Sequence, residues 1–120
     1  MYPAGTIIET WEVLYWHRGV ALGNGYVLHN TPGVGEQIIP ESVFIGNSKF
    51  KTRQPVSFDL GGFEARVRQA HTQPRNYSWL TWNCDHTVSW ALTGRAESPQ
   101  LQGYATFAVC TIALSALARA

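Results

Sequence analysis

The stretch "HRGVALGNGYVLHN", residues 17–30, decides the fold of the N-terminal part of this sequence. Two runs with several apolar residues flank Gly-Asn-Gly at positions 23–25. Glycine and asparagine tolerate the positive φ angles that tight hairpin turns need, so this cluster between apolar runs is a strong hairpin signal. The sequence therefore predicts two antiparallel strands joined at residues 23–25.

The length of the hairpin loop determines how the two histidines of this stretch are placed. A three-residue loop makes Leu22 face Tyr26. Gly19 then faces His29, and His17 lies diagonal to His29 on the same face. Diagonal neighbours are about 7–8 Å apart, within reach of long side chains. A two-residue loop would place the histidines on opposite faces, so the spacing permits a histidine pair in only one register.

The other segments predict a mixture of strands and helices. "GTIIETWEV" at 5–13 is rich in β-branched and aromatic residues, which favours a strand. In "GGFEARVRQA" at 61–70 the apolar residues recur with helical spacing. Residues 31–44 hold two prolines and two glycines and predict a loop, with a short strand at 37–39; another short strand is expected within 50–60. These elements predict an α+β fold, in which a small antiparallel β-sheet packs against helices.

A chain of 120 residues is the size of a single domain. We expect residues 1–100 to form it and residues 101–120 to be an uncharged C-terminal helix. No charge occurs from Leu101 to Ala118, and these 18 residues reach the short end of the ~17–25 that cross a bilayer. Because Ala, Ser and Thr dilute the segment, it is expected to be either a packed helix or a membrane-associating tail.

Charge and cysteine content limit the classes of function. The net charge is +1, and the arginines are spread without a run of like charges, so we expect no nucleic-acid partner. Two cysteines, Cys84 and Cys110, do not suggest a secreted disulfide scaffold, and the N-terminus has no basic region followed by an apolar core. We therefore expect a cytoplasmic protein with two free thiols and no signal peptide. Its charged fraction of 14%, against about 25% in typical domains, leaves membrane association open.

The stretch "NCDHTVSW", which starts at Asn83, presents a candidate nucleophile. Asn83 is a good cap for a helix that ends before Gly94, so Cys84 would occupy the first turn. Unpaired N–H groups and the helix dipole stabilise a thiolate there, and the same N–H groups suit an oxyanion. Beside an imidazole such a cysteine is a typical nucleophile. In this hypothesis His17 is the base and His29 holds and polarises it.

Other interpretations of these residues stay open. Free cysteine is among the most buried residue types, so Cys84 also suits a small position in the core. Histidines on a hairpin face are often structural. A zinc site formed by His17, His29, Cys84 and His86 is conceivable, but the spacings do not match a common zinc finger, and we expect no metal.

The two stretches together resemble the lecithin:retinol acyltransferase-like family (the LRAT domain), a branch of the NlpC-type, papain-like superfamily in which the histidine element precedes the cysteine element. "HRGVALGNGYVLH" is similar to the first family box, and "NCDHT" stands where the family has "NCEHF". The similarity extends to "PAGTIIETWEVLYWH" at 3–17, "ESVFIG" at 41–46 and the bacterial-type run "NYSWLTWNCDHTVSWALTGRAESPQ" at 76–100. The resemblance covers most of the chain.

The resemblance implies a circularly permuted papain-like fold. It implies acyl transfer or phospholipase A-type hydrolysis on phospholipid acyl esters through a cysteine acyl-thioester, without metal or cofactor. In that chemistry Cys84 is the nucleophile, His17 the general base and His29 the third, orienting residue. Supporting roles fall on the other box positions and on the residue two before the base, a candidate for supporting the oxyanion: Asn83, Asp85, His86 and Tyr15.

Three residues depart from the family pattern. Asp85 replaces Glu, Thr87 replaces Phe, and Arg18 brings a positive charge where members are more apolar. These changes leave the three catalytic positions intact and weaken any inference about substrate preference. Two alternatives therefore remain open: a cysteine peptidase or amidase of the same superfamily, and a catalytically silent domain that binds lipid or protein.

Overall fold

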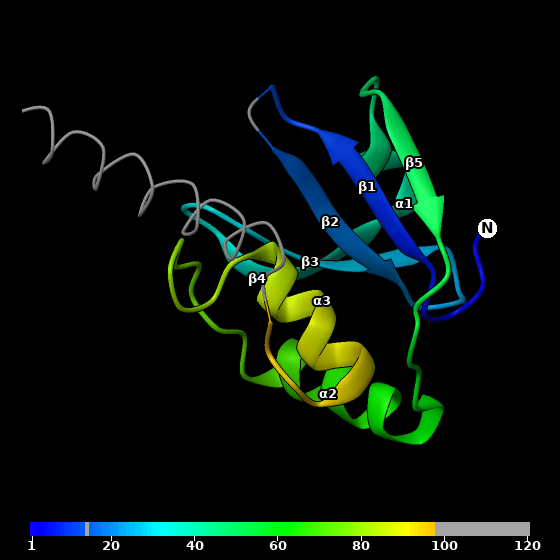
Figure 1. Cartoon of the computed structure of the whole chain (residues 1–120), viewed down its shortest axis with the longest axis vertical. Helices are drawn as coiled ribbons and strands as arrows, with labels where there is room; N and C mark the ends of the chain where they lie inside the picture. Colours follow the sequence, from blue (N-terminus) through cyan, green and yellow to red (C-terminus); the bar gives the residue numbers. More distant parts are fainter. Residues whose placement is uncertain (14, 98–120) are drawn as a thin grey trace, which may run out of the picture.

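The computed structural model describes residues 1–13 and 15–97 and has an α+β fold, as the sequence predicted. The strands are β1 (Ile7–Trp11), β2 (Trp16–Ala21), β3 (Tyr26–Thr31), β4 (Gly35–Pro40) and β5 (Phe50–Arg53), and the helices are α1 (Glu41–Ile45), α2 (Leu60–Thr72) and α3 (Cys84–Thr93). The strands form one antiparallel sheet in the order β4-β3-β2-β1-β5. Helices α2 and α3 pack beside each other against one face of this sheet (Figure 1).

The hairpin between β2 and β3 has the predicted three-residue loop. Gly19 is paired with His29, and the backbone N–H of Leu22 donates to the carbonyl of Tyr26 at 2.9 Å. The loop glycines at both ends have φ near +90°, a conformation that side chains rarely adopt. The register that brings the two histidines to one face is therefore confirmed.

Strands β2 and β3 diverge toward the turn between β1 and β2. Their ladder covers only Gly19–Ala21 on the β2 side, whereas the β1–β2 and β3–β4 ladders continue past that point. The start of α3 is bonded to both diverging strands. Arg18 Nη1 of β2 donates to Asp85 Oδ1 at 2.6 Å, and Asn30 Nδ2 of β3 donates to the carbonyl of Trp82 at 2.9 Å.

The core has two layers because side chains alternate between the two faces of the sheet. On one face, strand residues pack under α2 and α3: Ile7, Val20 and Leu28 contact Phe63, Ala70, Val88, Ala91 and Leu92. On the other face a smaller cluster packs against α1: Ile8, Ala21, Val27 and Phe44. The histidines belong to this second face, where both rings contact Phe44 at 5.4 Å between ring centroids.

The predicted loop over residues 31–44 is wrong, since this segment forms all of β4 and most of α1. Gly35 closes the turn with φ of 89°, and an added Cβ there would lie 2.7 Å from the carbonyl oxygen of Arg75. Pro40 ends the strand at the sheet edge, where no ladder hydrogen bond is lost, and starts α1. The prolines and glycines therefore mark the ends of regular elements, and the predicted short strand at 37–39 is the centre of β4.

The strand within 50–60 and the helix over 61–70 are confirmed as β5 and α2. The predicted C-terminal helix over 101–120, including Cys110, lies outside the described residues. Within the described ranges, no helix is both long and apolar enough to cross a membrane.

We expect Gly19→Ala to destabilise the protein, because the added Cβ would lie 2.5 Å from Val27 Cγ1 and 2.9 Å from the Phe44 ring. Overpacking of this kind costs about 1–3 kcal/mol, measurable as a lower free energy of unfolding in urea. Gly61→Ala is the matched control, since nothing lies within 4 Å of its added Cβ in α2. It should stabilise the helix by about 0.5–1 kcal/mol. Equal effects of the two substitutions would contradict the packing described for Gly19.

Candidate active site

Helix α3 starts with a reciprocal cap that fixes Cys84 in its first turn. The backbone N–H of His86 donates to Asn83 Oδ1 at 3.2 Å, and the backbone N–H of Asn83 donates to His86 Nδ1 at 3.0 Å. Asn83 Nδ2 also donates to the carbonyl of Trp79, and Gly94 ends the helix in the left-handed conformation. The predicted cap at Asn83 and the predicted end at Gly94 are both confirmed.

The two histidines form a direct hydrogen bond. His17 Nε2 and His29 Nδ1 are 2.9 Å apart, and both rings are buried. Gln37, which faces His29 in the β3–β4 register, lies 2.9 Å from His29 Nε2 through its amide nitrogen. His17 Nδ1 is buried and has no hydrogen-bond partner among the described residues, the sulfur of Cys84 included.

Cys84 lies against the backbone of β2 where this strand leaves β3. Backbone N–H groups of Arg18 and Asp85 donate toward its sulfur. Arg18 directly follows His17 in the strand. Arg18 therefore links the segment of the candidate base to the thiol, although no hydrogen bond joins Cys84 to His17.

Burial sets the protonation states of these groups. Burial, together with the charge of Asp85, raises the pKa of Cys84 to about 12, against hydrogen bonds and charge from Arg18. Burial also lowers the pKa of His17 to about 4 and, with the field of His17, that of His29 to about 4. The thiolate that the helix start was expected to favour is thus not the resting form. Cys84 is only 2% exposed, and the cost of burying a charge outweighs the helix N-terminus.

Two tyrosines lie near the thiol. Burial, then the field of Cys84, raises the pKa of both Tyr15 and Tyr77. The ring of Tyr15 also contacts His17 edge-on, with 6.3 Å between centroids, and packs against Trp79 at 5.4 Å. The hydroxyl of Tyr77 is buried without a hydrogen-bond partner in the described part of the chain. Tyr15 therefore lies near both His17 and Cys84, and its oxyanion role stays a prediction.

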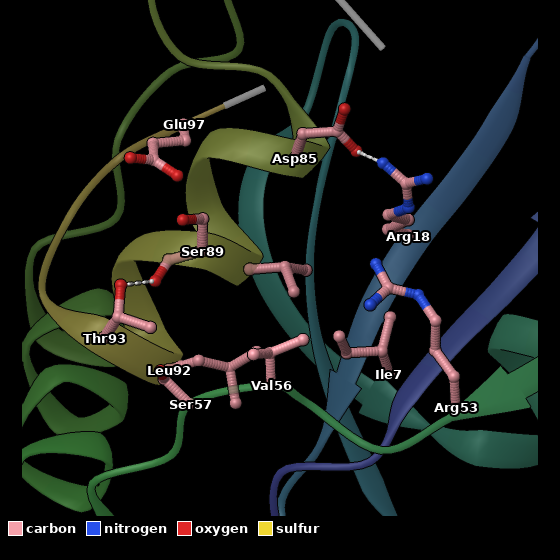
Figure 2. A pocket seen from close by; sticks show the side chains of 11 residues that line it. Ile7, Arg18, Arg53, Val56, Ser57, Asp85, Ser89, Leu92, Thr93 and Glu97 are labelled. Carbon is pink, nitrogen blue, oxygen red and sulfur yellow. Dashed lines mark hydrogen bonds and ion pairs between the residues drawn. The ribbon is translucent and has the colours of Figure 1, made fainter. Parts of the chain in front are cut away.

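Arg18 joins the helix start to a buried carboxylate on β1. Its Nε donates to Glu9 Oε1 at 2.7 Å and its Nη1 to Asp85 Oδ1 at 2.6 Å. Both carboxylate side chains are 2% exposed, and buried charges need such partners; Glu9 is also paired with Arg53 and Lys51. Arg18 and Asp85 also line a pocket of about 280 Å³ with an apolar floor that includes Ile7 and Leu92 (Figure 2). Cys84 does not line this pocket, so it is separate from the thiol.

A second buried carboxylate, Glu36 of β4, holds α3 from the other side. It accepts hydrogen bonds from the backbone N–H, Nε and Nη2 of Arg75, from Trp82 Nε1 and from Thr87 Oγ1, at 2.9–3.2 Å. Burial would raise the pKa of Glu36, but these donors hold it below its usual range. Thr87, which departs from the family pattern, is thus an anchor of the helix.

The structure brings together most residues that the sequence singled out. His17 contacts His29 and Tyr15, and Tyr15 and the backbone of Arg18 lie near Cys84, while Asn83, Asp85 and His86 serve the cap and the ion pair of the helix start. No three His, Cys, Asp or Glu side chains within the described ranges group closely enough to hold a metal ion. Sequence analysis missed Gln37 and Glu36, and only their alternation along β4 could have placed them on opposite faces.

A scan against models of protein families found no match, and a comparison with curated proteins found no significantly similar sequence. The family resemblance therefore rests on the motifs quoted above.

We expect the free energy of unfolding to fall as the pH drops from 6.5 to 4.5. The unfolded chain takes up protons on its histidines near their ordinary pKa of 6.5, whereas His17 and His29 stay neutral in the folded state until about pH 4. Below pH 6.5, each histidine lowers the free energy of unfolding by up to about 1.4 kcal/mol per pH unit. Its contribution to stability is therefore fully present above pH 6.5 and is lost as the pH falls. Urea unfolding across this range measures the slope.

His29→Asn should flatten that dependence, whereas His71→Asn, at an exposed histidine of α2, should leave it unchanged. A dependence that is the same in both variants would show that the buried pair does not cause it.

We expect alkylation of Cys84 by iodoacetamide to be slow at neutral pH and to rise about tenfold per pH unit without a plateau between pH 7 and 9, because the reactive thiolate forms only near pH 12. Mass spectrometry of a Cys110→Ser variant isolates this thiol. A plateau in that range would mean that a thiolate already exists in the resting protein.

Proposed function

We propose that the protein is a thiol-dependent acyltransferase or acyl hydrolase that acts on phospholipid-like acyl esters through an acyl-thioester on Cys84. One observation carries the proposal. His17 of β2 is hydrogen-bonded to His29 of β3, and the next residue of β2, Arg18, directs its backbone N–H to the sulfur of a cysteine in the first turn of a capped helix. In this proposal the fold is a circularly permuted papain-like one.

The proposed reaction starts from a neutral Cys84 thiol and a neutral His17 ring. As the sulfur of Cys84 attacks the ester carbonyl, its proton passes to His17 Nδ1, which has no other partner in the described residues. The carbonyl oxygen becomes an oxyanion, stabilised by the N–H groups of Arg18 and Asp85 and by Tyr15. The carbon–oxygen ester bond then breaks, and the alcohol leaves with the proton from His17. Water or a second alcohol resolves the thioester by the same steps in reverse.

Gln37 decides whether His17 Nδ1 is free to accept that proton. With its amide nitrogen toward His29 Nε2, Gln37 donates, His29 Nδ1–H donates to His17, and the remaining proton of His17 lies on Nδ1. If the amide oxygen takes that place, every donor reverses and Nδ1 becomes an acceptor. The two amide orientations exchange oxygen for nitrogen at the same positions. The reactive form in our proposal has the oxygen of Gln37 toward His29.

Two alternatives use the same residues differently. A cysteine peptidase or amidase would attack an amide with the same nucleophile and base, and the test below separates the bond types. The burial and raised pKa of Cys84 favour the second alternative, a catalytically silent binding domain. We favour the acyl-ester enzyme because the buried nitrogen of His17 and the two N–H groups at the sulfur match the needs of thiol attack.

We expect incubation with phosphatidylcholine in mixed micelles to add the mass of one acyl chain to Cys84, as seen by intact mass and peptide mapping. Cys84→Ala should abolish the adduct, and His17→Ala should slow its formation by about 10²–10⁴-fold, the contribution of a general base. Cleavage of peptide or amide substrates without ester turnover would support the peptidase. No adduct and no turnover of either bond type would support the silent domain.

Variants of Gln37 sharpen this test. Gln37→Glu can only accept from His29 and should keep the acylation rate, whereas Gln37→Leu removes the partner and should lower it. The substitution Gln54→Leu is a matched control in a residue that lies apart from the site. An acylation rate unaffected by Gln37→Leu would contradict the assigned proton order.

A further inference from the structure

Exposed apolar side chains gather at the end of the sheet where β1 turns into β2. Figure 1 shows that turn and the start of β5 at the same end of the sheet. Trp11 ends β1, Phe50 begins β5, and both are partly exposed, while Val13 in the turn is 79% exposed. Trp11 packs against Trp16 across the two strands at 5.3 Å. We call the residues 11–13, 15–16 and 49–51 the sheet tip.

The backbone of the sheet tip is strained in a way that holds an apolar side chain outward. Val13 has φ of 66°, and no other non-glycine residue in the described ranges has a positive φ. A β-branched residue is poorly suited to this conformation, which glycine or asparagine adopts easily. Among the described residues, neither packing nor backbone geometry explains a valine here, which points to a contact outside the protein.

The sheet tip carries two lysines and one carboxylate, Glu12, and this excess of positive charge indicates the kind of contact. Lys49 and Lys51 flank Phe50, and the backbone N–H of Trp11 donates to the carbonyl of Lys49 at 2.9 Å. Lys51 lies over the ring of Trp16, with 4.1 Å from Nζ to the centroid. Tryptophan combined with lysine is typical of surfaces that enter the head-group region of anionic bilayers.

The sheet tip continues into the loop that leads to the thiol. Tyr15 contacts the ring of Trp79, which is 54% exposed, and the next residue, Leu80, is 72% exposed. Trp79 accepts the hydrogen bond from the Asn83 side chain that caps α3. The exposed apolar side chains therefore lie on the side of the molecule where Cys84 starts its helix.

We infer that the sheet tip, together with Trp79 and Leu80, docks the protein on an anionic phospholipid surface. The apolar side chains enter the head-group layer, and Lys49 contacts the phosphates, whereas Lys51 is already paired with Glu9 at 3.4 Å. This surface is distinct from the C-terminal tail and does not depend on the acyl chemistry. It faces a bilayer with the side of the molecule that holds the candidate nucleophile.

The test is flotation of the full chain, carrying Cys84→Ala, with vesicles of phosphatidylcholine that contain phosphatidylglycerol. Because this variant has no nucleophile, the result is separate from the proposed acyl chemistry. Val13→Asp and Leu80→Asp should each weaken partitioning by about tenfold or more, the factor that burial of one aliphatic side chain supplies. Val34→Asp, at a valine that is 62% exposed in the turn between β3 and β4, should leave it unchanged.

Val13→Gly should change stability and membrane binding in opposite directions, which a purely structural role of Val13 would not produce. Relief of the backbone strain should raise the urea midpoint of unfolding, while the loss of the side chain weakens partitioning. Lys49→Gln should weaken binding only to vesicles that contain phosphatidylglycerol. Arg68→Gln, at an exposed arginine of α2, should leave binding to both kinds of vesicle unchanged. Equal losses for Val13→Asp and Val34→Asp, equal binding to neutral and anionic vesicles, or no flotation would each overturn the inference.

Discussion

The candidate site depends on the hydrogen bonds that the buried carboxylate of Glu36 accepts. Its side chain has no exposed surface, and it binds the guanidinium and backbone of Arg75, the indole of Trp82 and the hydroxyl of Thr87. These partners lie on the loop before α3 and on α3 itself. An isolated buried charge is very costly, so the carboxylate requires all of them to be in place. The position of Cys84 against β2 is thus set from β4, at the far edge of the sheet.

Local signals in the sequence predicted the elements, and long-range pairs decided how they meet. Gly-Asn-Gly set the hairpin register and Asn83 set the start of α3, since both act within a few residues. The bonds of Glu36 with Arg75 and of Arg18 with Asp85 span 39 and 67 residues and carry no local pattern. The pKa of the Cys84 thiol was expected to be lowered, but it is raised. Burial, which the sequence does not show, outweighs the stabilisation of a thiolate by the helix N-terminus.

The candidate site combines a neutral thiol and a neutral histidine pair with apolar side chains on the nearby surface. Neutral groups lower the cost of burying a nucleophile and its base, and attack then requires the proton to move as the carbon–sulfur bond forms. In the proposed function the ester carries its acyl chains within a bilayer, so the docking surface inferred above would bring substrate to the buried thiol without a wide water-filled cleft. In this view Arg18 contacts the thiol and the start of α3 inside the protein, and the exposed Trp79 and Leu80 belong to the surface of the same region.

The open sheet has two edges, and the features already described protect both. Along β4 the backbone N–H of Glu36 is taken by the carbonyl of Arg75, and Pro40 offers no donor. Along β5, all four residues are exposed, and its two cations repel a second copy of the same strand. Unprotected strand edges recruit other chains into aggregates. A protein that docks on a lipid surface, as inferred above, would be concentrated there and would face this hazard most strongly, so the protection of both edges would matter most in that setting.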